Sequence, residues 1–216
     1  MKHIKKIPYG IASYDRMKED NRFYFVDKTQ YIEKIENLGS QFLFFLRPRR
    51  FGKSLFLSIL EHYYDVNKKG RFEELFGDTY IGKNPTPLRN TYPILKLNFS
   101  GLSTQGNYEE IEKSFNFHVF IAISDFYTEY SGMFGNLDIQ RDYADITDAN
   151  EMITKFVSLI KANQAKFYLL IDEYDNFANN ILIHHGKERY QRVTHQAGFL
   201  RSFFAAVKNG TESGAI

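Results

Sequence analysis

Two short runs of apolar residues stand out along the chain, at positions 42–46 and 167–171, and a third segment, 93–99, alternates between apolar and polar side chains. Each is too short for an amphipathic helix, and the two uniform runs lack helical periodicity. Strands that are buried on both faces of a parallel sheet have this character. The pattern therefore predicts strands over residues 41–46, 93–99 and 167–171.

Between these segments, apolar residues recur three and four positions apart, as on one face of a helix. This spacing predicts helices over residues 31–38, 53–66, 72–76, 108–130, 151–162 and 188–208. A short aromatic strand is expected at 23–26, a loop at 184–186, a surface connection at 131–148, and Gly210 is expected to end the last helix. Strands that alternate with helices indicate an α/β fold with a parallel sheet.

The composition is that of an ordinary soluble globular protein, with 43% apolar and 25% charged residues. A net charge of +2 is too small to indicate direct binding to nucleic acid. No apolar run approaches the ~20 residues of a membrane span, and the basic N-terminus lacks the apolar region of a signal peptide. Cysteine is absent, which excludes disulfides and suits a reducing cytoplasm. We therefore expect a cytoplasmic protein with no membrane partner.

The first segment that carries chemistry is FLFFLRPRRFGKS at 42–54, where an apolar run leads into Gly-Lys-Ser and then into a predicted helix. This is the layout of a nucleotide triphosphate site, in which backbone N–H groups of the loop and of the helix start face the phosphates. Lys53 is expected to reach the β- and γ-phosphates as a catalytic residue, and Ser54 to bind Mg²⁺. The predicted nucleotide-binding residues are Arg47, Pro48, Arg49, Arg50, Phe51, Gly52, Lys53, Ser54 and Leu55.

The second segment is the apolar run 167–171, which ends in Asp172-Glu173. Acidic residues at the carboxyl end of a buried strand face the crevice in which α/β sheets bind ligands. There Asp172 is expected to bind Mg²⁺ and Glu173 to act as the base that activates a water molecule. The structural alternative is that the two acids cap the following helix and stabilise its first turn.

Other residues near these motifs allow two interpretations. Arg47 occupies the position where the usual loop has glycine, and Arg47, Arg49 and Arg50 either contact phosphates or are surface charges. His184 and His185 lack a third ligand at metal spacing, which favours a loop role over a zinc site. Tyr174 and Asp175 are interpreted as structural.

Together these segments resemble a known bacterial family, the predicted AAA-ATPases. The matching pieces are PYGIASYDRM (8–17), FYFVDKT (23–29), FLFFLRPRRFGKS (42–54), PILKLNFSG (93–101), FYLLIDEYDN (167–176) and FFAAVKNGTESGAI (203–216). The resemblance covers essentially the whole chain. It also makes Arg47 a feature of the family's loop rather than a departure from it.

The resemblance implies a three-layer P-loop NTPase fold of the additional-strand type, with sheet order 5-1-4-3-2. It implies an N-terminal segment, 1–30, that packs on an ATPase-like domain over 31–216. It also implies that family members continue into a sensor strand, a helical region and often a nuclease-like domain. The domain over 31–216 is therefore expected to be incomplete at its C-terminus, with self-association as one consequence.

Two functions follow as expectations. The first is an ATP-binding, Mg²⁺-dependent ATPase module that serves as a regulatory or motor part of a larger nucleic-acid-processing or defence protein. In that setting nucleic acid is only an indirect partner, and turnover by this chain alone is expected to be weak. The alternative is a non-hydrolysing nucleotide-binding or protein-interaction module.

Overall fold

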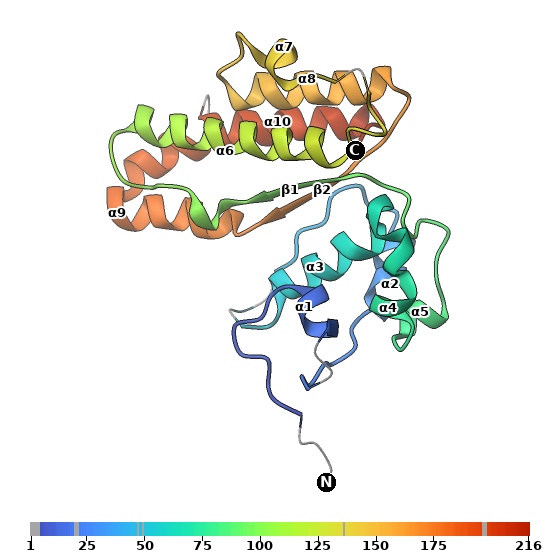
Figure 1. The fold of residues 1–216 in the computed structure, drawn as a ribbon. Helices are drawn as coiled ribbons and strands as arrows, with labels where there is room; N and C mark the ends of the chain where they lie inside the picture. The colour runs from blue at the N-terminus through green and yellow to red at the C-terminus, as the bar shows by residue number, and fades with distance from the viewer. Residues whose placement is uncertain (1–4, 20–21, 47, 49, 136, 196–197) are drawn as a thin grey trace. The chain divides into compact units, whose positions relative to one another are not determined.

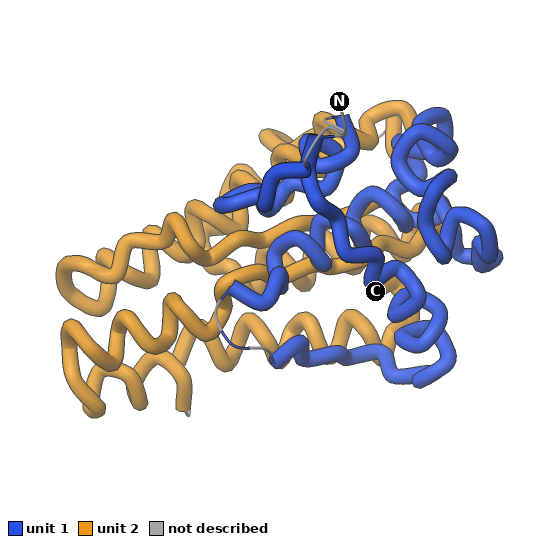
Figure 2. The backbone as a smooth tube through the Cα atoms, turned by 90° about the horizontal axis from the view of Figure 1, so that it is seen from below, with its two compact units in different colours: residues 1–92 blue, residues 93–216 orange. Residues whose placement is uncertain are grey.

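A computed structural model describes residues 5–19, 22–46, 48, 50–135, 137–195 and 198–216. The chain divides into two compact units, residues 1–92 and residues 93–216, which Figure 2 shows in different colours. The division that the sequence predicts at residue 30 stays a prediction. Within the described residues, no helix is long and apolar enough to cross a membrane.

The first unit is helical. Its elements are α1 (Tyr14–Glu19), α2 (Gln30–Asn37), α3 (Lys53–Tyr64), the 3-10 helix η1 (Val66–Arg71), α4 (Phe72–Phe76) and α5 (Tyr80–Lys83) (Figure 1). Tyr14, Tyr63 and Phe76 are fully buried where α1, α3 and α4 meet. The ring of Phe76 lies 5.1 Å from that of Tyr14 and 5.6 Å from that of Tyr63, so these aromatic rings form the centre of the unit.

The second unit holds a small parallel sheet and the longer helices. Its elements are β1 (Ile94–Asn98), η2 (Phe99–Gly101), α6 (Tyr108–Glu129), α7 (Ile139–Tyr143), α8 (Ala149–Ala162), β2 (Tyr168–Asp172), α9 (Tyr174–Thr194) and α10 (Phe199–Glu212). The two strands pair in register, from Ile94 opposite Tyr168 to Asn98 opposite Asp172. Helix α6 packs on β1, and α8 contacts both α6 and α10 (Figure 1).

Local sequence signals explain where the helices of the second unit begin. Asn107 accepts a hydrogen bond from the N–H of Glu110, and the Glu110 side chain accepts one from the N–H of Asn107, which forms a capping box at the start of α6. Asp148 caps α8 through the N–H groups of residues 150 and 151. Each cap satisfies backbone donors that would otherwise have no partner within the helix.

The predicted strands at 93–99 and 167–171 are confirmed, as are the helices that begin near residues 31, 53, 72, 108 and 151. The connection at 131–148 contains the short helix α7. The chain is therefore a mixed α/β protein that is mostly helical, with a two-stranded parallel sheet in its described residues. The finer expectation, a three-layer P-loop fold, stays a prediction.

The strand predicted over residues 41–46 is wrong. These residues belong to no strand, and the side chains of Phe44 and Leu46 are 70% and 77% exposed. Phe45 alone turns inward, where its ring stacks on that of Phe56 from α3 at 4.9 Å. A parallel strand is held by ladder hydrogen bonds to a neighbour, so an apolar run without such a neighbour does not become one.

The aromatic strand expected at 23–26 is reduced to an isolated parallel bridge between Lys6 and Phe23. The loop expected at 184–186 is reduced to a kink, because Gly186 has a non-helical backbone (φ 79°, ψ 178°) and the helical segments on its two sides together make up α9. The helix expected over 188–208 is divided, with α9 ending at Thr194 and α10 beginning at Phe199.

Gly210 does not end the last helix but lies buried inside α10. A Cβ atom at this position would lie 2.8 Å from Cδ1 of Ile216 and 2.9 Å from Cγ2 of Val157. Close packing rather than a turn therefore favours glycine here, since a larger residue would make the side chains of Ile216 and Val157 shift.

Candidate functional site

The start of α3 has the geometry expected of a phosphate-binding helix start. Gly52 precedes the helix with a left-handed backbone (φ 77°) and, as a glycine, has no side chain to cap the first turn. A Cβ at Gly52 would meet nothing within 4 Å, so the position is open. Lys53, Ser54 and Leu55, all half-buried, form the first turn. The N–H groups of such a turn attract anions, so these residues fit a phosphate group.

The described residues of the loop before α3 are turned and exposed. Arg50 has a left-handed backbone (φ 67°), and the N–H of Phe51 donates to the carbonyl of Pro48 at 3.4 Å. Pro48, Arg50 and Phe51 are exposed. Arg47 and Arg49, also predicted to bind nucleotide, lie outside the described residues. An L-residue in the left-handed region stores about 1–2 kcal/mol of strain, which surrounding structure tolerates most often at functional sites.

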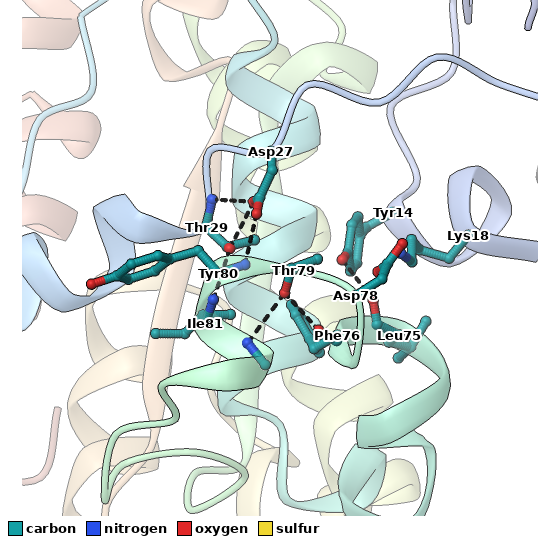
Figure 3. Close-up of polar contacts among 11 residues, drawn as sticks. Tyr14, Lys18, Asp27, Thr29, Leu75, Phe76, Asp78, Thr79, Tyr80 and Ile81 are labelled. Carbon is teal, nitrogen blue, oxygen red and sulfur yellow. Dashed lines mark hydrogen bonds and ion pairs between the residues drawn. The ribbon is translucent and has the colours of Figure 1, made fainter.

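Tyr14 connects α3 to α4 from a fully buried position. Its N–H donates to the Ser58 hydroxyl, one turn beyond Ser54, at 3.0 Å. Its own hydroxyl donates to the carbonyl of Leu75 at 2.7 Å (Figure 3). Burial raises the pKa of Tyr14 far above its usual value, so the hydroxyl remains a donor at physiological pH. The motif PYGIASYDRM therefore contains a buried residue that is hydrogen-bonded to the candidate phosphate-binding helix.

The motif FYFVDKT forms a second connection in the same unit, centred on the buried Thr29. The N–H and hydroxyl of Thr29 both donate to Oδ1 of Asp27, whose Oδ2 accepts from the N–H of Tyr80 at 2.7 Å. The Thr29 hydroxyl also accepts from the N–H of Ile81 at 3.1 Å, which ties the start of α2 to α5 (Figure 3). Asp27 and Thr29 therefore have structural roles, although neither was a predicted site residue.

We expect Thr29→Val to destabilise the first unit by about 1–3 kcal/mol, because a buried donor that loses its partner keeps its full desolvation cost. Valine has nearly the same shape, so the cost reports the lost hydrogen bonds to Asp27 and Ile81. Thr91→Val is the matched control, because Thr91 is exposed. Urea unfolding followed by circular dichroism measures both; equal midpoints for the two variants would contradict this role.

A second set of candidate residues, in the second unit, lies where β2 ends. Asp172 is the last residue of β2, and its Oδ1 accepts a hydrogen bond from the N–H of Glu173 at 3.0 Å. Glu173 has a left-handed backbone (φ 57°) and immediately precedes α9. Both residues are half-buried. The backbone of Glu173 is strained, and two partly accessible carboxylates that are adjacent in sequence have the chemistry of a metal-binding and water-activating pair.

Asn98 lies beside this pair and was missed in the sequence. It ends β1 directly opposite Asp172, and paired positions of parallel strands project from the same face of the sheet. The Asn98 side chain accepts from the N–H of Ser100. The backbone of Asn98 is hydrogen-bonded to the side chain of His118. Burial lowers the pKa of His118, and this hydrogen bond opposes the shift. The predicted strand ran one residue too far, to 99, which hid Asn98 as the terminal polar residue.

The structure thus groups the predicted residues into two sets. Lys53 and Ser54 share the start of α3 in the first unit, and Asp172 and Glu173 share the end of β2 in the second, each described by itself. His184 is exposed, and His185 is bound to a backbone carbonyl rather than to a cluster of ligands. In the described part of the chain, no three His, Asp or Glu side chains converge as a metal site does.

Comparison with known proteins adds a family. The chain is 35% identical, over 97 residues, to an uncharacterized protein in the vnfD 5′ region of Azotobacter chroococcum mcd 1. That match covers 45% of this chain and 17% of the relative, so the chain corresponds to a small part of that longer protein. No solved structure matches. The model of the predicted AAA-ATPase family matches residues 8–215, nearly the full length, and the chain therefore belongs to the predicted AAA-ATPase family.

Proposed function

We propose that this chain binds ATP with its phosphates at the start of α3 and that Glu173 activates the water molecule that attacks the γ-phosphate. The family assignment supports an ATP-binding ATPase module in general terms. The observation that carries the specific proposal is the start of α3, where the open, left-handed Gly52 leads directly into Lys53 and Ser54 in the first turn of the helix.

Each residue of the first unit has a separate task in this proposal. The N–H groups of the first turn of α3 bind the β-phosphate, and the ammonium group of Lys53 neutralises charge on the β- and γ-phosphate oxygens. The hydroxyl of Ser54 is one ligand for Mg²⁺. The guanidinium of Arg50, exposed in the loop, adds positive charge near the phosphates.

In the second unit, Asp172 is the further ligand for Mg²⁺ and Glu173 is the base. When bound, Mg²⁺ withdraws charge from the phosphate oxygens and so stabilises the transition state. The N–H of Glu173 holds one carboxylate oxygen of Asp172 and leaves the other for ligand binding. The Asn98 amide, beside Asp172 on the sheet edge, is suited to orient the Glu173 carboxylate or its water.

The test of this function is Lys53→Ala. In the parent chain, Mg²⁺-ATP at about 100 times its dissociation constant stabilises the folded state by about 2.7 kcal/mol. We expect Lys53→Ala to abolish most of this stabilisation, because the β- and γ-phosphates lose their cationic partner. Thermal unfolding with and without Mg²⁺-ATP measures the difference.

Lys69→Ala is the control, since Lys69 is exposed on η1 of the same unit and away from the loop. It should keep the parent's full response to ATP. If ATP stabilises Lys53→Ala as much as the parent, the phosphates bind elsewhere. Loss of the response when Mg²⁺ is omitted would support the proposed cofactor.

The wider setting is part of the same proposal. A cytoplasmic regulatory or motor role in a larger nucleic-acid-processing or defence protein fits the family and the greater length of the curated relative. The alternative is a module that binds nucleotide without hydrolysing it. ATP binding without phosphate release would favour that alternative.

A further inference from the structure

Helix α9 is fastened to the segment that leaves β1. Nε2 of His185 lies 2.5 Å from the carbonyl oxygen of Thr104. The guanidinium of Arg189 donates to the carbonyl of Gly106 at 2.7 Å and to Nδ1 of His185 at 2.9 Å. His185 therefore accepts at Nδ1 and donates at Nε2. Both ring nitrogens and one Arg189 nitrogen are used, which distinguishes His185 from the exposed His184.

The backbone on both sides of this contact has a special conformation at a glycine. His185 and Arg189 are four positions apart in α9, and the kink at Gly186 lies between them. On the other side, Gly106 has φ 98°, and a Cβ there would lie 2.2 Å from a carboxylate oxygen of Glu110. Glu110 is fixed in turn by the capping box of α6. The accepting carbonyls therefore belong to a segment that is itself held in place.

The contact completes a closed circuit of chain segments at the carboxyl edge of the sheet, called the ring below. One segment, 98–106, starts at Asn98, and the other, 173–189, starts at Glu173; their origins are neighbours because Asn98 pairs with Asp172. Inside the ring, Phe99 of η2 packs against Phe177, which lies one turn into α9, with ring centroids 6.2 Å apart. The two segments that leave the edge are thus joined at the edge, in the middle and at the far end.

We propose that His185 and Arg189 are positioning residues for the carboxyl edge of the sheet: by fastening α9 to residues 104–106 they hold the start of α9, and with it Glu173, in place. Neither residue touches the edge itself. The catalytic meaning of this inference rests on the proposed function. The contact of His185 and Arg189 with residues 104–106, called the tether below, can be measured without any turnover. A charged donor shared by two acceptors makes Arg189 the stronger of the two contacts.

The experiment is hydrogen exchange on the full chain, comparing His185→Ala and Arg189→Gln with the matched exposed controls His184→Ala and Arg201→Gln. We expect both tether variants to speed exchange on the order of tenfold in residues 99–106 and in the first two turns of α9, since local opening governs exchange there. Helix α8, which is outside the ring, should keep its protection. The controls should match the parent throughout.

Unchanged exchange at the start of α9 in both tether variants would overturn the proposal, because the contact would then hold only the nearby loop. If His185→Ala also loosens α8, the variant Arg189→Lys decides, since it keeps the charge and one donor. Intermediate protection at the start of α9 would support the positioning role, and loosening of the whole second unit would contradict it.

Where the chain turns over ATP, kcat of the tether variants should fall while the Mg²⁺-ATP thermal shift stays unchanged. Exchange effects without any parent turnover would uphold the tether while contradicting the proposed ATPase.

Discussion

Replacing Glu173 with glutamine is expected to slow phosphate release from ATP by at least about a hundredfold, because general bases commonly contribute 10²–10⁴ in rate. Glutamine keeps the size and the hydrogen-bonding reach of the side chain but cannot accept the proton of the attacking water. Binding of ATP should be unaffected, since Glu173 is assigned no phosphate contact. Phosphate release and the Mg²⁺-ATP thermal shift measure the two effects separately.

Glu188→Gln is the matched control, because Glu188 is exposed on the same helix, α9, and the substitution is identical. Equal rates of release from Glu173→Gln and the parent, both above a blank without protein, would remove Glu173 from its role. A parent that binds ATP and releases no phosphate would instead favour the non-hydrolysing alternative.

The largest expected effect on stability is that of Phe115→Ala, which should destabilise the second unit by about 3–5 kcal/mol. Phe115 is fully buried on α6, and its ring contacts four others. The centroid distances are 5.4 Å to Phe99, 6.1 Å to Phe177, 5.1 Å to Phe199 and 5.3 Å to Phe203. Those rings come from η2, α9 and α10, so truncation leaves a cavity where several elements meet.

Phe117→Ala provides the comparison, because Phe117 lies on the same helix but is 64% exposed. Urea unfolding by circular dichroism, with hydrogen exchange in α8 to report on the second unit, should show almost no loss for this variant. A Phe115→Ala cost below about 1 kcal/mol would mean that the neighbouring rings collapse into the space, or that the cluster is not the core.

The hydrophobic pattern predicts most elements of the fold because it records which side chains turn inward. It succeeds for β1 and β2 and fails for residues 41–46, whose apolar side chains look the same in sequence. What differs is the backbone partner: residues 94–98 and 168–172 pair with each other, and residues 41–46 join no strand. Side-chain character alone does not reveal a ladder neighbour.

The candidate site is predictable where one segment contains both an apolar run next to a helix and the residue that carries the chemistry. Lys53 and Asp172 each follow an apolar run at the junction with a helix, and the structure places both at those junctions. Asn98 carries no such signal, because its position depends on pairing with a strand far away in sequence. The contacts of His185 and Arg189 with residues 104–106 join segments that are far apart in sequence, and the His-His-Gly segment does not indicate them.

The parallel pairing of β1 with β2 has a consequence for how the protein is made. Helices α6, α7 and α8 lie between the two strands in sequence, so during synthesis the ribosome releases β1 well before its partner exists. Contacts between distant segments form late in folding, and until then β1 presents unpaired N–H and carbonyl groups. The candidate catalytic edge therefore exists only after residue 172 has emerged. A nascent chain halted before that point should be prone to aggregation through β1.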